Sequence, residues 1–371
     1  MKKHFGLWYS TIIVGIIALV GVIGFSMTAC DDGNGKKGNT GDGLPALSWT
    51  NVAGSGSYIW SIAWSGSKFA AVGGNSAGSS GAIRTSADGV TWSSSGTNFI
   101  DTGGNSAGFP DYLINDVTWG GPAGSEKFWM AGSYRVASSS DGVAWAYTTN
   151  EPCFGTATVL NGIAWGSPSG TDRVVLVGKA SGGAGIFYSD DGAAWTEAHT
   201  ASTDPNPFGS SNANKVAWGA GKFVAVGDSG KIAYSADGIA WTAAANSTFG
   251  TTKINNITFG GASGQEKFVA VGNDGRIAHS PDGITWTAVG NSTFGTTGLT
   301  SVIYDVSWGK DRFVAVGGAG GHKIAVSANG TAWTASTHAL GDNILSVAYG
   351  AARFILGGGQ TQSLAYSNTL E

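Results

Sequence analysis

A short block of the form Ser-x-Asp/Asn-Gly-x-x-Trp recurs along the chain, and this repetition limits the possible folds more than any other feature. The block occurs six times, and its tryptophans are 53, 50, 46, 45 and 47 residues apart. These tryptophans are Trp92, Trp145, Trp195, Trp241, Trp286 and Trp333. A regular period of this length indicates one supersecondary unit used repeatedly, with each unit burying its apolar face against its neighbours.

Two further blocks keep the same period and occur seven times each. One is a basic residue followed by mainly apolar residues and glycine, as in KFVAVG, and it begins at Lys68, Lys127, Arg173, Lys222, Lys267, Arg312 and Arg353. The other ends in an aromatic residue and is centred on Trp64, Trp119, Trp165, Trp218, Phe259, Trp308 and Tyr349. The counts predict seven units over residues 46–371.

Each unit is predicted to form four short antiparallel strands, here called A to D in chain order. Strand A carries the aromatic residue, strand B the basic-apolar block, strand C the Ile-Ala-x-Ser segment and strand D the tryptophan. The Asp-Gly or Asn-Gly step between strands C and D predicts a two-residue type I′ hairpin. Four-stranded units of ~40–50 residues are typical of β-propeller blades. We therefore expect an all-β, seven-bladed propeller.

The two ends of the repeat region complement each other. The last unit stops after LAYSN (Leu364 to Asn368), whereas Trp49 in LSWTNV precedes the first complete unit. We expect the N-terminal strand to complete the last blade, because an open ring leaves unpaired strand edges. An open solenoid of seven units is the alternative, but it gives the complementary ends no role.

Composition excludes several classes of function. Glycine accounts for 62 of 371 residues, and charged residues for only 12%, with a net charge of −4. A charge-poor, mildly acidic chain lacks the basic surface of a nucleic-acid-binding protein. The chain has only two cysteines and five scattered histidines, so no Cys/His zinc site is predicted. We expect no metal and no cofactor.

The first 30 residues have the pattern of an export signal. A basic start at Lys2 and Lys3 precedes an apolar run from Thr11 to Phe25 and small residues before Cys30. The ending Met-Thr-Ala-Cys resembles a bacterial lipobox, which implies a lipid on Cys30. We therefore expect a signal peptide over 1–29, a glycine-rich tether over 30–45 and a location at the bacterial cell envelope. An uncleaved membrane anchor is the alternative.

The repeated Ser-x-Asp-Gly-x-x-Trp block resembles the Asp-box of propellers such as sialidases, sortilin-type receptors and photosystem-assembly propellers. That resemblance implies a structural turn, in which each acidic or amide side chain accepts backbone N–H groups. The positions concerned are Asp88, Asp141, Asp191, Asp237, Asp282 and Asn329. We expect these residues to stabilise turns rather than to bind metal or catalyse a reaction.

Strand alternation predicts two different faces. The tight face carries the A–B and C–D turns, and the loop face carries the B–C turns and the long D–A loops, such as 93–114, 146–160, 196–213 and 287–302. Long loops on a rigid scaffold are favoured sites of function. Two features recur on the loop face: basic residues that open strand C and phenylalanines in the D–A loops. The candidate ligand-binding residues are Arg135, Lys231, Arg276, Lys323, Phe154, Phe208, Phe249 and Phe294.

These cations and aromatic rings suit a carbohydrate or an acidic peptide. The alternative is that each phenylalanine plugs its loop onto a neighbouring blade. The basic residues that open strand B are expected to lie on the tight face and to pair with the next hairpin. Asp116 and Asp305 are expected to line the channel. Cys153 is expected to be a small buried or loop thiol.

We therefore predict a monomeric, lipid-anchored module that binds or scaffolds a protein, peptide or glycan, and no enzyme activity. A sialidase-like glycoside hydrolase and a purely structural surface protein are the two alternatives.

Overall fold

The computed structural model describes residues 43–52, 57–75, 81–94, 99–101, 113–133, 135–147, 153–154, 158–180, 183–198, 206–295, 301–318, 323–336, 343–359 and 363–371. The predicted signal peptide, Cys30 and residues 30–42 of the predicted tether lie outside this range. Within it, no helix has both the length and the apolar character needed to cross a membrane. Residues Leu47–Glu371 form one compact unit.

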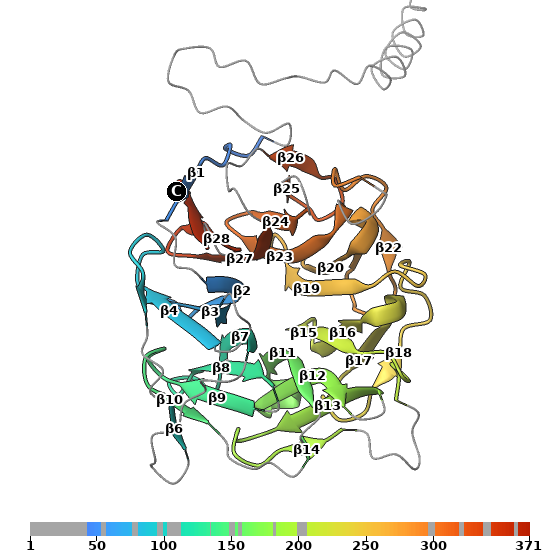
Figure 1. Ribbon diagram of the computed structural model, residues 1–371. Coiled ribbons are helices and arrows are strands. Elements are labelled where there is room, and N and C mark those ends of the chain that lie inside the picture. Colours follow the sequence, from blue (N-terminus) through green and yellow to red (C-terminus); the bar gives the residue numbers. More distant parts are fainter. Residues whose placement is uncertain are drawn as a thin grey trace, which may run out of the picture. The chain divides into compact units, whose positions relative to one another are not determined.

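This unit contains seven separate sheets arranged around a centre, so the seven-bladed propeller prediction is confirmed (Figure 1). Blade 1 contains β2 (Ser57–Trp64), β3 (Phe69–Asn75), β4 (Gly81–Ser86) and β5 (Ser93–Ser94). Blade 2 contains β7 (Ile114–Gly120), β8 (Lys127–Gly132), β9 (Arg135–Ser139), β10 (Trp145–Tyr147) and β6 (Phe99–Asp101). Blade 3 contains β11 (Val159–Gly166), β12 (Arg173–Ala180), β13 (Gly183–Ser189) and β14 (Thr196–Glu197).

The remaining four blades repeat the arrangement. Blade 4 contains β15 (Ala213–Gly219), β16 (Lys222–Gly227), β17 (Ile232–Ser235) and β18 (Thr242–Ala243). Blade 5 contains β19 (Ile254–Gly260), β20 (Lys267–Gly272), β21 (Ile277–Ser280) and β22 (Thr287–Ala288). Blade 6 contains β23 (Ile303–Gly309), β24 (Arg312–Gly317), β25 (Lys323–Ser327) and β26 (Thr334–Ser336). Blade 7 contains β27 (Ile344–Gly350), β28 (Arg353–Gly358), β29 (Leu364–Ser367) and β1 (Trp49–Asn51). Three short 3-10 turns complete the described elements: η1 (Pro168–Gly170), η2 (Asp228–Gly230) and η3 (Asn273–Gly275).

Blade 7 closes the ring through the N-terminal strand, as predicted. Strand β1 pairs antiparallel with β29, and Trp49 lies opposite Ser367. The amide oxygen of Asn368 accepts a hydrogen bond of 2.8 Å from the backbone N–H of Ser48. The ring is thus closed by backbone pairing between two segments more than 300 residues apart, which removes one pair of open sheet edges.

Blade 2 differs from the prediction because it has a fifth strand. Strand β6 comes from the loop between blades 1 and 2 and pairs parallel with the outer strand β10. No other described blade has a fifth strand. The sequence of this loop gave no alternating pattern that predicts an added strand.

The C–D turns are wider than the predicted two-residue type I′ turns, so that prediction is wrong. Strand β17 ends at Ser235 and β18 begins only at Thr242. A type I′ turn needs positive φ at both central residues, but in this turn only Gly238 adopts it, at 78°. The wider turn is held instead by backbone N–H groups that donate to the side chains of Ser235 and Asp237.

The aromatic-glycine ending of strand A explains how neighbouring blades pack. A side chain added at Gly219 would lie 2.1 Å from the Phe259 ring of the next blade, and one at Gly350 would lie 2.5 Å from Trp64. Only glycine leaves room for such a ring. Each aromatic also packs on a strand-B residue of its own blade, as Trp64 does on Phe69 with ring centroids 4.3 Å apart. The repeated aromatic-glycine pair therefore holds blade to blade, including blade 7 to blade 1.

Candidate functional site

The centre of the propeller is where the seven blades differ most. Each inner strand has a register shift at the same place, a β-bulge that re-aims one residue. The residues that follow this shift are Ser61, Asp116, Gly162, Lys215, Asn256, Asp305 and Ser346. We call this set the bulge ring. Five of its members line a central cavity of about 300 Å³: Ser61, Asp116, Lys215, Asn256 and Asp305.

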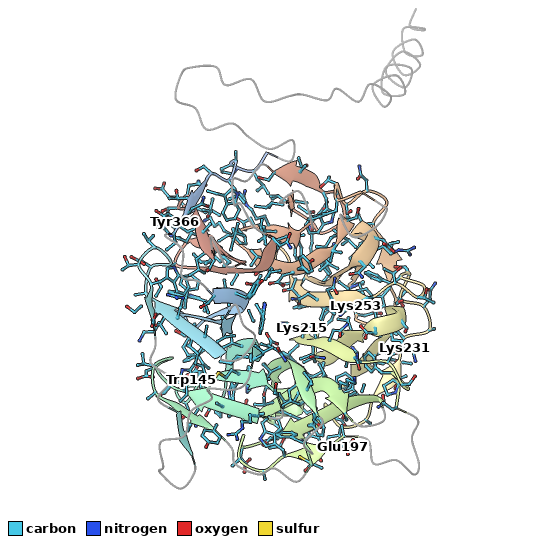
Figure 2. All side chains as sticks on the ribbon, viewed as in Figure 1. Trp145, Glu197, Lys215, Lys231, Lys253 and Tyr366 are labelled. Carbon is cyan, nitrogen blue, oxygen red and sulfur yellow. The ribbon has the colours of Figure 1, made fainter. Side chains whose placement is uncertain are left out.

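One half of the bulge ring is organised by Asp116, which is only 1% exposed. Its Oδ1 atom accepts hydrogen bonds from Ser61 Oγ at 2.7 Å and from Lys215 Nζ at 2.5 Å. Its Oδ2 atom accepts one from the backbone N–H of Ile163 at 2.8 Å. One carboxylate therefore connects blades 1, 2, 3 and 4. Lys215 lies at the inner side of the ring (Figure 2).

The other half is organised by Asp305. Its Oδ1 atom accepts a hydrogen bond from Asn256 Nδ2 at 2.5 Å, and its Oδ2 atom accepts one from the backbone N–H of Val347 at 2.8 Å. Burial raises the pKa of Asp305 to about 7, although Lys215 and the N–H groups of Val347 and Val306 favour the charged form. The Asp305 carboxyl group thus connects blades 5, 6 and 7 and changes charge near neutral pH.

A second cavity, of about 390 Å³, opens above the bulge ring at the loop-face end of the inner strands. We call it the channel mouth. Five of its residues stand one position before the bulge ring. One is Trp60, and the other four are asparagines, each of which donates from Nδ2 to a backbone carbonyl of the next blade. The bonds are 2.9 Å from Asn115 to Leu160, 3.0 Å from Asn161 to Ala213, 2.8 Å from Asn214 to Ile254 and 2.9 Å from Asn255 to Ile303.

This asparagine ladder leaves acceptor atoms at the channel mouth. Within the described part of the chain, no group donates to the amide oxygens of these four asparagines. A buried or half-buried carbonyl oxygen retains its capacity for a hydrogen bond. The mouth therefore presents several neutral acceptors in an arc over blades 2 to 5.

Apolar and basic groups complete the lining of the channel mouth. Trp60 is half-buried and stacks with Tyr58, with ring centroids 6.3 Å apart. Val159 is 36% exposed and is one of three large apolar side chains that the described residues expose. Lys179 and Lys253 are both exposed, and Lys253 Nζ lies 3.6 Å from the carboxylate of Asp228. Lys253 lies towards the centre of the ring in Figure 2.

The four loop phenylalanines proposed as ligand contacts are core residues in this structure. Phe154 and Phe249 are 2% and 1% exposed, and Phe208 and Phe294 are 0% exposed. Phe249, for example, packs in the apolar cluster between blades 4 and 5, with Trp286 and Phe268. All four rings are therefore buried in clusters between neighbouring blades, and the structure corrects their assignment from ligand contacts to loop plugs.

The basic residues that open strand C hold the same loops. Lys231 Nζ donates to the carbonyl of Phe208 at 2.7 Å, and Arg276 Nη1 donates to that of Thr248 at 3.2 Å. The Arg135 guanidinium lies 5.0 Å from the centroid of the Tyr147 ring. Lys323 opens β25, but its side chain is outside the described residues. Each described cation thus has a contact within its own blade or the loop before it.

The repeated turn residues form one hydrogen-bond pattern in all six C–D turns. The acidic or amide Oδ1 atom accepts from the backbone N–H groups two and three residues ahead, as Asp88 does from Val90 and Thr91, both at 2.8 Å. These bonds from Thr91 and Val90 lower the pKa of Asp88. The same bonds are made by Asp141, Asp191, Asp237, Asp282 and Asn329.

Two of the basic residues that open strand B on the tight face contact the next hairpin through its backbone rather than its carboxylate. Lys68 Nζ donates to the carbonyl of Asp141 at 3.0 Å, and Arg173 donates to the carbonyl of Asp237. Arg173 also forms an ion pair with Asp190 in its own blade. These contacts connect blade 1 to blade 2 and blade 3 to blade 4 on the tight face.

Two further groups of residues bear on chemistry. In the described ranges, no three His, Cys, Asp or Glu residues gather in a way that could hold a metal ion. Cys153 is half-buried and packs against the apolar cluster between blades 2 and 3. Polar side chains from several blades come together in the two central cavities, at the channel mouth and in the bulge ring.

Sequence reasoning placed Asp116 and Asp305 at the channel but missed Lys215 and the asparagine ladder. The sequence carries a signal for the bulge ring. When the seven copies are aligned, the bulge position varies, whereas apolar residues recur around it.

Comparisons with known proteins support the fold. No family model matches the chain, and no curated protein is significantly similar to it in sequence. Among solved structures, YCF48 bound to D1 peptide is similar over 88% of this chain and 98% of its own, with a TM-score of 0.59 and 15% identity. YCF48 from Cyanidioschyzon merolae is similar over 86% and 98%, with a TM-score of 0.59 and 17% identity. Virginiamycin B lyase from Staphylococcus aureus is similar over 88% and 99%, with a TM-score of 0.61 and 12% identity. At these identities the likeness concerns the β-propeller fold alone.

Proposed function

We propose that this propeller is a binding module that holds an extended peptide segment of another protein at the channel mouth. The observation that carries the proposal is that one concavity combines apolar groups, amide oxygens and two exposed lysines. The two lysines do not recur at the matching positions of the other blades. Groups that a repeat does not need for its own packing are candidates for function.

The chemistry of the channel mouth suits a peptide with an acidic group. Peptide N–H groups complement the asparagine oxygens, an apolar side chain packs on Trp60 and Val159, and a carboxylate approaches Lys179 and Lys253. The similar propeller YCF48 is solved with a bound D1 peptide, which supports a peptide as the class of ligand. A glycan is the second class to be tested.

The experiment is to apply the purified propeller to an array of varied 12-residue peptides and, separately, to a glycan array. We expect binding to acidic peptides, and at least a ten-fold loss in the Lys179→Ala/Lys253→Ala double variant. The matched control is Lys127→Ala/Lys310→Ala, which removes two exposed lysines outside the channel mouth. Retention of glycans alone, or equal loss in both double variants, would overturn the proposal.

We also propose that the module binds without turnover. Both carboxyl groups of the bulge ring are buried and accept hydrogen bonds from neighbouring blades at both of their oxygens, which favours a structural role for them. Hydrolysis of sialosides by the purified protein would contradict this proposal and favour the sialidase-like alternative.

For the rest of the chain, we propose that a lipid on Cys30 holds the propeller, as a monomer, at the bacterial cell envelope through the tether over 30–45. We also propose that the repeated C–D turns are related to the Asp-box. Metabolic labelling with a palmitate analogue should mark the wild-type protein and not Cys30→Ser. Equal labelling of both proteins would exclude this anchor.

A further inference from the structure

Blades 2 and 5 both have an arginine just before or at the start of strand C, but they differ in the strand-D residue that lies next to it. In blade 2, Tyr147 lies opposite Ala137, and Arg135 stands two residues before Ala137. In blade 5, the matching pair is Ala288 opposite Ala278, and the matching cation is Arg276. Blade 5 therefore keeps the cation of blade 2 and lacks its aromatic ring.

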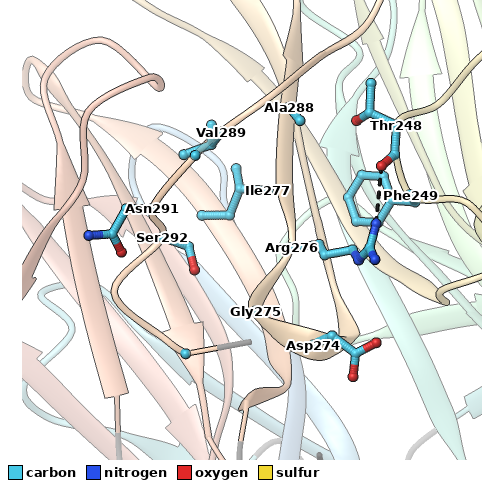
Figure 3. A pocket seen from close by; sticks show the side chains of 12 residues that line it. Thr248, Phe249, Asp274, Gly275, Arg276, Ile277, Ala288, Val289, Asn291 and Ser292 are labelled. Atoms are coloured by element: carbon cyan, nitrogen blue, oxygen red, sulfur yellow. Dashed lines mark hydrogen bonds between the residues drawn. The ribbon is translucent and has the colours of Figure 1, made fainter. Parts of the chain in front are cut away.

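The missing ring corresponds to a hollow. In blade 2, the Tyr147 ring is 4% exposed and lies against Arg135. In blade 5, a cavity of about 260 Å³ is lined by Arg276, Ala288, Thr248, Phe249 and Asn291, among others (Figure 3). A cavity of about 150 Å³ holds a benzene molecule, so this hollow has room for a phenol ring. Arg276 is exposed, and its Nη1 bond to Thr248 fixes it at one side of the hollow.

Blade 2 also shows that an additional strand can pair with the outer edge of a blade. Strand β6 pairs parallel with β10, and Asp101 lies opposite Tyr147. In blade 5 no described strand pairs with the outer edge of β22, and both of its residues are exposed. Side chains directly opposite each other on paired strands point to the same face. A residue paired with Ala288 would therefore direct its side chain towards the hollow beside Arg276.

We propose that the outer edge of blade 5 binds an extended segment of a partner protein as a parallel fifth strand, with an aromatic side chain seated against Arg276. Backbone pairing along β22 supplies orientation, and the hollow supplies selection for a ring. The guanidinium stabilises the ring through a cation–π contact, as Arg135 does with Tyr147. This site is separate from the channel mouth and does not depend on the function proposed there.

The internal fifth strand provides the probe. It is a synthetic heptapeptide with the sequence of residues 97–103 in which Asp101 is replaced by tyrosine, D101Y. Titration of the isotope-labelled protein should shift the amide signals of Thr287, Ala288 and Arg276 more than those of other blades. The same heptapeptide carrying D101A should bind about five-fold more weakly, because it lacks the ring.

Two variants of the protein distinguish binding at this site from non-specific binding. Ala288→Tyr fills the hollow as Tyr147 does in blade 2 and should abolish these shifts, and Arg276→Ala should weaken binding two- to five-fold. The matched control is Ala243→Tyr, which makes the same change at the matching position of blade 4 and should leave binding to blade 5 intact. Lys179→Ala/Lys253→Ala should also leave it intact.

Absence of shifts at millimolar D101Y peptide would overturn the proposal. So would equal binding of the D101Y and D101A peptides, or unchanged binding to Ala288→Tyr. Because Ala288 is exposed, the tyrosine variant is expected to fold, and its amide spectrum provides that check.

Discussion

The C–D turns and the bulge ring use aspartate in opposite ways. In the six turns, the same serine, acidic or amide residue, glycine and tryptophan recur, and each carboxylate is exposed to solvent on one side and accepts two N–H bonds. In the bulge ring, the seven residues are diverse, and its two aspartates are buried. Hydrogen bonds lower the pKa of Asp88, whereas burial raises that of Asp305. Repetition therefore marks residues that build a blade, and divergence marks residues that differentiate the channel.

The largest expected loss of stability is that of Asp116→Ala, and it is best compared with Asp141→Ala in the same blade. Asp116→Ala removes the partner of Lys215, whose side chain is only 17% exposed, and should lower the free energy of unfolding by about 3–5 kcal/mol. Asp141→Ala removes two backbone hydrogen bonds and one from Ser139 Oγ at an exposed turn, and should cost about 1–2 kcal/mol. Urea unfolding of both variants measures the difference.

The double variant Asp116→Ala/Lys215→Met sharpens this comparison. If the uncompensated ammonium causes most of the loss, the double variant should be more stable than Asp116→Ala alone. Equal losses in Asp116→Ala and Asp141→Ala would show that the two classes of aspartate do not differ energetically.

The pH dependence of stability should separate the two regions by sign. Because the folded pKa of Asp305 is about 7 and an unfolded aspartate has a pKa of about 3.9, the folded state holds the extra proton between these values. Stability should therefore fall as pH rises from about 4 to about 7, by at most about 4 kcal/mol. The turn aspartates act oppositely, since their lowered pKa gives stability that is lost only as pH falls below about 4.

Thermal unfolding of the wild type and Asp305→Asn across pH 4 to 8 measures this effect. The asparagine variant should show a flatter profile in that window, whereas Asp88→Asn should change the profile only at lower pH. A wild-type stability that rises between pH 4 and 7 would contradict the assignment to Asp305.

The smallest expected effect concerns the asparagine ladder. Asn161→Ala removes one bond to the carbonyl of Ala213 and should reduce the free energy of unfolding by about 1 kcal/mol. Replacement of a turn serine, Ser280→Ala, should have a similar or slightly larger effect, because the N–H of Gly283 then loses its acceptor in a buried place. Calorimetry of both variants tests whether inner and outer contacts contribute alike.

Much of the fold could be predicted because its determinants lie close together in the sequence. The Ser-Asp-Gly-Trp turns, the apolar strand B and the aromatic-glycine pair each act within one unit or between adjacent units. Closure by Trp49 was also predictable, because two incomplete units at the ends of a repeat add up to one. The wider C–D turn was not predictable from Asp-Gly alone, since its backbone N–H groups bond to the side chains of Ser235 and Asp237.

The candidate sites depend on contacts that no local pattern encodes. Lys215 reaches Asp116 from 99 residues away, and β6 pairs with β10 across 46 residues. The loop phenylalanines looked like surface groups in the sequence, but burial of an aromatic ring is favourable enough to draw each one into the core.

The number of blades, the order of their strands and the partner of the last strand could all be read from the amino-acid sequence, because they follow from its periodicity and from the two complementary ends of the repeat. Which polar residues meet at the centre, which rings are buried and which edge stays open emerged only in three dimensions. Those outcomes depend on how seven similar units face one another in space, and side chains with the same local sequence environment can end up in water or in the core.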